Sequence, residues 1–81
     1  MVQIDTIIEK LNLLFSIGDY DNAQKLLEST RKVPELYNDT VAIYDATISL
    51  NNGDYSQMWE AIRRGLECNP ENYELYVMLG E

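Results

Sequence analysis

The stretch Gly18-Asp19-Tyr20 recurs as Gly53-Asp54-Tyr55, and each copy is followed by apolar residues at the spacing of an α-helix. Repetition with a period of about 35 residues is typical of a solenoid built from helix-turn-helix units. A single unit of this kind cannot bury its apolar face alone, so neighbouring units must stack. The repeat therefore predicts an all-α fold in which helical hairpins pack side by side.

The first unit is expected to hold two helices joined at Gly18. The apolar residues before this glycine have the spacing of one helix face; they are Ile4, Ile7, Ile8, Leu11, Leu14 and Phe15. Gly18 can adopt the positive φ that ends a helix, and the side chain of Asp19 can cap the next one. Basic residues at the carboxyl end of a helix are favoured, so the second helix is predicted to end near Lys32.

The third predicted helix lies between residues 34 and 50. Pro34 ends the helix before it, and the new helix would start at Asn38, at Asp39 or with Pro34 in its first position; the sequence favours none of these. The segment 40–50 is rich in β-branched residues, as strands are. Its apolar residues nevertheless keep helical spacing, at Tyr37, Val41, Tyr44 and Ile48, and a helix is predicted.

Two more helices are expected after Gly53. The first has an apolar stripe of Tyr55, Met58, Trp59, Ile62 and Leu66, in which Trp59 and Ile62 are predicted to anchor the core. Glu60 and Arg64 are spaced to pair along its surface. Asn69 suits a cap and Pro70 suits the first helical position, which predicts a last helix over 70–80 with Tyr73, Tyr76 and Leu79 on one face.

These patterns divide one domain, residues 1–81, into three parts. The predicted boundaries are about 3–34 for the first repeat, 35–69 for the second, and 70–81 for a capping helix or the start of a third repeat. The expected fold is thus a helix-turn-helix solenoid of about five helices.

The motifs resemble those of the tetratricopeptide repeat family. The turn Gly18-Asp19-Tyr20 with Ala23, the turn Gly53-Asp54-Tyr55 with Asn69-Pro70, and Tyr76 with Leu79-Gly80 match parts of that pattern. Met58 departs from it where a small residue is expected, and Lys10-Leu11 departs where Leu-Gly is expected. The resemblance implies that the first helix of each pair lines a concave groove that binds extended peptides or partner helices.

The composition excludes several classes of function. Fourteen acidic and six basic residues give a net charge of −8, which repels nucleic acid and anionic membranes and favours basic or neutral partners. No apolar run approaches the ~20 residues of a membrane span. The single cysteine, Cys68, cannot form an internal disulfide and is expected to be a small packed residue in a reducing, cytoplasmic setting.

The residue types argue against catalysis. The chain has no histidine, which removes the usual side chain for acid–base chemistry near neutral pH and a common metal ligand. Asp19 and Asp21 could be imagined as a calcium-binding pair, but the further oxygen ligands at the right spacing are missing, and helix capping explains them better. We therefore expect no catalytic residue, no metal site and no cofactor.

The expected function is a non-catalytic scaffold for protein–protein interaction. By the resemblance, the groove that binds a peptide or helix would be lined by Ile8, Asn12, Phe15, Ile43, Thr47 and Leu50. Its apolar floor and the acidic charge favour a basic and apolar partner. Helix packing is the competing explanation for Phe15, Ile43 and Leu50.

Two other functions remain open at this stage. The repeats could serve as an accessory or dimerisation segment of a larger bacterial enzyme, because the run 69–75 followed by Leu79-Gly80 looks similar to repeat regions attached to bacterial glycosyltransferases. The apolar strip could also be covered by a second copy of the chain in a homodimer.

Overall fold

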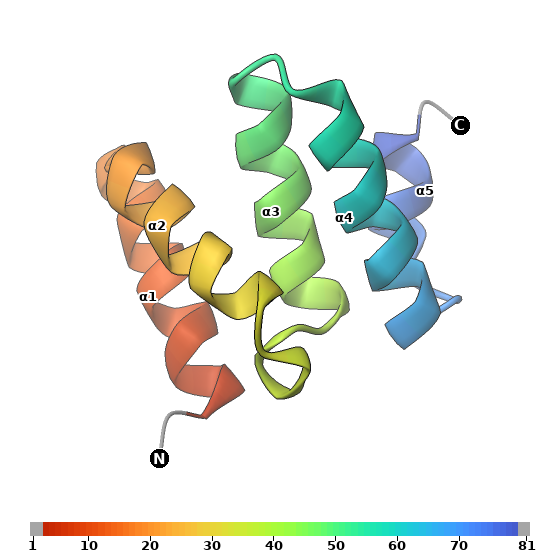
Figure 1. The fold of residues 1–81 in the computed structure, drawn as a ribbon, viewed down its shortest axis with the longest axis horizontal. Coiled ribbons are helices and arrows are strands. Elements are labelled where there is room, and N and C mark those ends of the chain that lie inside the picture. Colours follow the sequence, from red (N-terminus) through yellow and green to blue (C-terminus); the bar gives the residue numbers. More distant parts are fainter. Residues whose placement is uncertain (1–2, 80–81) are drawn as a thin grey trace.

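The computed structural model describes residues 3–79, which form five α-helices and one 3-10 turn and contain no strand (Figure 1). The elements follow the order α1 (Ile4–Ile17), α2 (Tyr20–Arg31), η1 (Pro34–Leu36), α3 (Asp39–Asn51), α4 (Tyr55–Cys68) and α5 (Tyr73–Met78). The predicted all-α fold is confirmed. No helix within this range is long and apolar enough to cross a membrane.

The repeated tripeptide builds the same turn twice. Gly18 and Gly53 adopt φ values of 77° and 75°, a left-handed conformation that glycine takes without a steric penalty. The carboxylates of Asp19 and Asp54 then accept hydrogen bonds from backbone N–H groups in the first turns of α2 and α4, at 3.3 and 3.1 Å. Each turn reverses the chain, which makes α1–α2 and α3–α4 antiparallel hairpins (Figure 1).

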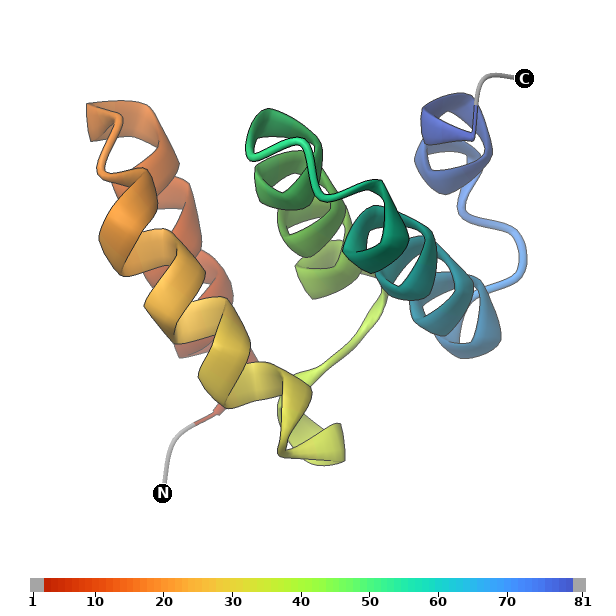
Figure 2. The same ribbon diagram turned by 45° about the horizontal axis from the view of Figure 1, so that its top comes forward.

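Helix α3 occupies the centre of the molecule and contacts all four other helices. Figure 2 shows the α1–α2 hairpin on one side of it and α4, followed by α5, on the other. Because it is covered from several directions, α3 is buried around much of its circumference, including Val41, Ala42, Ala46 and Ile48. The core continues into the neighbouring helices through Ile7, Leu11, Ala23, Leu27, Met58, Ala61, Ile62 and Leu75.

Two of the three helix starts that the sequence left open occur in the segment between α2 and α3. Pro34 takes the first position of the 3-10 turn η1, where its missing N–H is not needed. Asn38 caps α3 by accepting a 2.9 Å hydrogen bond from the N–H of Val41. The proline and the asparagine therefore start two separate elements.

The prediction for the last helix is wrong about its start and its buried face. Asn69 and Pro70 form a turn, and α5 begins at Tyr73 after the cap Asn72. Leu75 is the fully buried residue of this helix, whereas Tyr73 is 77% exposed. The short helix is anchored by a leucine that the predicted face did not include, and Gly80 lies outside the described residues.

The carboxylate of Asp39 holds this turn in place. It accepts hydrogen bonds from the side-chain amides of Asn69 and Asn72, at 3.0 and 2.7 Å. These bonds, the one from Asn69 first, lower the pKa of Asp39 below its ordinary value. The first turn of α3 is thus tied to the segment that leads into α5.

Other side-chain predictions on α4 also need correction. Trp59 is 55% exposed and Ile62 only 1% exposed, so Ile62 alone belongs to the core. Glu60 pairs with Arg63, not with Arg64. Cys68, predicted to be packed, is exposed because it stands at the last, solvent-facing turn of α4. Its thiol lies 3.8 Å from the carbonyl oxygen of Tyr37.

Candidate functional site

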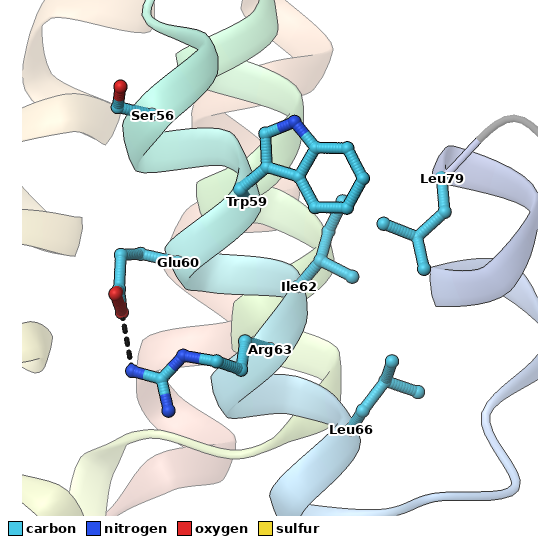
Figure 3. Close-up of a pocket in the computed structure, with 7 residues that line it drawn as sticks. All are labelled: Ser56, Trp59, Glu60, Ile62, Arg63, Leu66 and Leu79. Atoms are coloured by element: carbon cyan, nitrogen blue, oxygen red, sulfur yellow. Dashed lines mark hydrogen bonds and ion pairs between the residues drawn. The ribbon is translucent and has the colours of Figure 1, made fainter.

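An apolar hollow opens between α4 and the carboxyl end of α5. It has a volume of about 670 Å³ and is lined by Ser56, Trp59, Glu60, Ile62, Arg63, Leu66 and Leu79. Figure 3 shows the side chains of Trp59 and Leu79 facing each other across it, with Ile62 at its floor. We refer to this feature as the α4–α5 hollow.

The packing of α4 explains why a tryptophan lies at the mouth of this hollow. The residues that α4 turns toward the core are Met58, Ala61, Ile62 and Gly65. Gly65 makes the closest approach, since a Cβ on it would lie 2.6 Å from the Cβ of Ala42. Trp59 follows Met58 and therefore points beside the core, where its ring covers the edge of the hollow and remains exposed.

Charged groups occupy only one side of the hollow. Arg63 donates to Glu60 and to Glu67, both at 2.6 Å, and all three side chains are more than half exposed. The pKa of Arg63 is raised, first by its hydrogen bond with Glu60. Because one cation serves two carboxylates, this edge carries a net negative charge.

A second junction, between α2 and α3, is polar and contains a buried ion pair. The carboxylate of Asp45 is fully buried and accepts hydrogen bonds from Nε of Arg31 at 3.1 Å, with Nη2 forming a close ion pair. Tyr37 donates its hydroxyl proton to the same carboxylate at 2.8 Å, and Nε2 of Gln57 donates at 3.3 Å. Among the described residues, no buried side-chain polar atom lacks a partner.

The electrostatics of this network suit structure and not catalysis. Burial, followed by the charge of Asp45, raises the pKa of Tyr37, so its phenol stays protonated. Arg64 lies 3.9 Å above the centroid of the Tyr37 ring, a cation–π contact that covers the network from α4. The pKa of Arg31 is raised by its hydrogen bond to Asp45. A protonated phenol and a fully paired carboxylate leave neither a base nor a nucleophile.

The six residues predicted to line a concave groove lie on α1 and α3. Ile8, Phe15 and Ile43 are half-buried and pack against the core. The ring of Phe15 packs edge-on against those of Tyr20 and Tyr44, at centroid distances of 5.5 and 4.9 Å. The other three residues, Asn12, Thr47 and Leu50, are exposed, and the hydroxyl of Thr47 is bonded to the carbonyl oxygen of Ile43.

None of these six residues lines the α4–α5 hollow, nor the polar hollow at the α2–α3 junction. The sequence interpretation missed the α4–α5 hollow because it placed Trp59 in the core. A signal was present in the repeat, since Trp59 stands at the same position after its Gly-Asp-Tyr turn as the polar Gln24 after the first turn. A position that is polar in one unit and aromatic in the other is less typical of a shared core.

No cluster of three or more metal-ligating side chains occurs among residues 3–79. Comparison with known proteins found no matching family model, no matching curated protein and no matching solved structure. The function is therefore inferred from the geometry of the chain itself.

Proposed function

We propose that this protein is a non-catalytic interaction module that holds an amphipathic helix of a partner protein in the α4–α5 hollow. The observation that carries the proposal is the exposed Trp59 at the mouth of an apolar hollow that lies between α4 and Leu79 at the end of α5. Trp is highly buried on average in folded proteins, and it is enriched among the residues that dominate binding energy at interfaces.

The shape of the hollow favours a helix as the occupant. Helix α4 forms one wall and Leu79, at the carboxyl end of α5, stands opposite it. A groove beside helices accepts a further helix through apolar residues spaced three or four positions apart. Burying apolar surface there yields about 25 cal/mol per Å². The side chains of Trp59, Leu66 and Leu79 would supply most of that contact on this protein's side.

The charge of the chain favours a partner helix with a basic polar face. The net charge is −8, and the two arginines of α4 are already engaged, Arg63 by Glu60 and Glu67 and Arg64 over the ring of Tyr37. Cations are therefore attracted at long range, and an acidic helix would find no free arginine on α4. A second copy of the chain carries the same −8 and is disfavoured for the same reason.

We also propose that the helical hairpins belong to a tetratricopeptide-like solenoid. Two features support this: the repeated turns at Gly18 and Gly53, and the contacts that α3 makes with both α1 and α5. In such a solenoid the α4–α5 hollow is the place where a further helix would stack on the second hairpin.

Fluorescence tests the proposed function directly, because Trp59 is the only tryptophan. The probe is a synthetic amphipathic helix of Leu, Ala and Lys without aromatic residues. Its binding should shift the Trp59 emission to shorter wavelength as the indole leaves water. A peptide of the same composition in scrambled order and a peptide with Glu in place of Lys serve as controls, and neither should produce the shift.

Two charge-matched variants locate the site. Leu66→Arg places a cation in the hollow and should weaken binding at least tenfold, whereas Ile17→Arg changes an exposed apolar residue of α1 and should leave it unchanged. Circular dichroism checks that both variants fold. Equal weakening by the two variants, or sedimentation showing that a dimer of the chain fills the hollow, would contradict the proposal.

A further inference from the structure

The α2–α3 junction and the α4–α5 junction are equivalent positions of the two repeats. Arg31 and Leu66 lie equally far along the chain from the capping residues Asp19 and Asp54. Asp45 and Leu79 lie equally far from the caps Asn38 and Asn72. The ion pair of the first junction is thus replaced by two leucines at the second, and both leucines line the α4–α5 hollow.

The difference extends to a third position. Gln24 of α2 accepts a 2.9 Å hydrogen bond from the side chain of Asn52 at the end of α3. Its counterpart on α4 is Trp59, which makes no side-chain hydrogen bond among those found for residues 3–79 and lies at the mouth of the hollow. Three polar positions of one junction are therefore apolar at the other.

The first junction shows how a helix docks on such a surface. Helix α4 packs along α3 and places Gln57 against the carboxylate of Asp45, where the amide donates a 3.3 Å hydrogen bond. Helix α4 thus places a polar side chain, that of Gln57, against the polar junction. In the second junction the atoms at that place are the methyl groups of Leu66 and Leu79, which can neither accept nor donate a hydrogen bond.

We infer that Leu66 and Leu79 determine which partner helix binds in the hollow. The preferred helix carries an apolar residue at the position that corresponds to Gln57 of α4. This inference rests on the proposed function and specifies its partner. A helix with glutamine at that position would bury an amide without a hydrogen-bond partner, which weakens binding by about tenfold or more. The leucine pair therefore also keeps out helices that resemble this chain's own α4.

The inference is tested by measuring how variants of Leu66 and Leu79 bind two probe peptides that differ at one position. The double variant Leu66→Arg/Leu79→Asp moves the ion pair of the first junction into the hollow and leaves the net charge unchanged. The probes are two basic amphipathic peptides of identical sequence except for leucine or glutamine at the centre of the apolar face. Trp59 emission reports binding, and the variant Leu66→Met/Leu79→Met controls for altered packing in an apolar pair.

The wild-type protein and the double-methionine variant should bind the leucine peptide about tenfold more tightly than the glutamine peptide. The ion-pair variant should lose or reverse this preference. Equal affinity of the wild-type protein for both peptides overturns the inference but leaves the proposed function intact, and this comparison does not require the ion-pair variant to fold. Absence of binding by either peptide overturns both.

Discussion

Arg31 and Asp45 form an ion pair that joins the first helical hairpin to the second. The carboxylate of Asp45 is 0% exposed, and the side chain of Arg31 is 24% exposed, so the pair is shielded from most of the solvent. Tyr37 and Gln57 donate to the same carboxylate from η1's end and from α4. Four segments of the chain thus meet at one buried charge, which fixes their relative register.

Removing the cation Arg31 should destabilise the folded protein, because the buried charge of Asp45 then lacks its counterion. Arg31→Leu leaves a buried carboxylate without its counterion and is expected to lower the free energy of unfolding by about 3 kcal/mol, measured by urea denaturation. Arg31→Leu/Asp45→Leu removes the charge as well and should lose less than Arg31→Leu alone, because leucines occupy the equivalent positions at Leu66 and Leu79. A loss in the double variant equal to the sum of the losses in Arg31→Leu and in Asp45→Leu would show that the pair is not coupled.

Trp59 and Ile62 should respond very differently to truncation. Ile62→Ala opens a cavity in the core and is expected to cost about 2–5 kcal/mol. Trp59→Ala removes a ring that is more than half exposed and should cost about 1 kcal/mol or less. Thermal melting followed by circular dichroism measures both; a loss with Trp59→Ala as large as that with Ile62→Ala would place the indole in the core.

Gly65→Ala is expected to destabilise the protein, although alanine is the better helix former. The new Cβ would lie 2.6 Å from the Cβ of Ala42 and 2.7 Å from a methyl carbon of Leu75. Overpacking of this kind costs about 1–3 kcal/mol, which exceeds the gain of about 1 kcal/mol from helix propensity. Ser56→Ala, on the exposed face of α4, is the control and should change the melting temperature little. A rise in melting temperature with Gly65→Ala would show that α3 and α5 can move away from α4.

Tyr37 predicts how stability depends on alkaline pH. Its folded pKa is raised above the ordinary 10.0 by burial and by the charge of Asp45, so its contribution is fully present below pH 10.0 and is lost as the pH rises above that value. Tyr37→Phe should cost about 1 kcal/mol at neutral pH through the lost hydrogen bond to Asp45. It should also flatten the fall in the urea midpoint as the pH rises above 10.0. Parallel pH profiles for the two proteins would assign the alkaline loss to other groups.

The sequence by itself determined the first four helices and the two turns that pair them. Positive φ at Gly18 and Gly53 and side-chain capping by Asp19 and Asp54 are local effects that depend on residues close in the chain. The helical spacing of apolar residues likewise reported that 40–50 is a helix in spite of its β-branched residues. Local effects of this kind do not depend on what a helix packs against.

Only the tertiary structure decided which apolar residues of each helix are covered. Met58 and Trp59 are adjacent and both fit the stripe of α4, but Met58 is buried in the core and Trp59 is exposed at its edge. The same holds for Leu75, which is buried because α5 begins later than its sequence signals indicated and meets α3 and α4 along a different face. The ion pair of Arg31 with Asp45 joins two helices whose approach no local pattern specifies. Burial and charge pairing depend on neighbours distant in sequence, and for that reason the α4–α5 hollow emerged only from the packed helices.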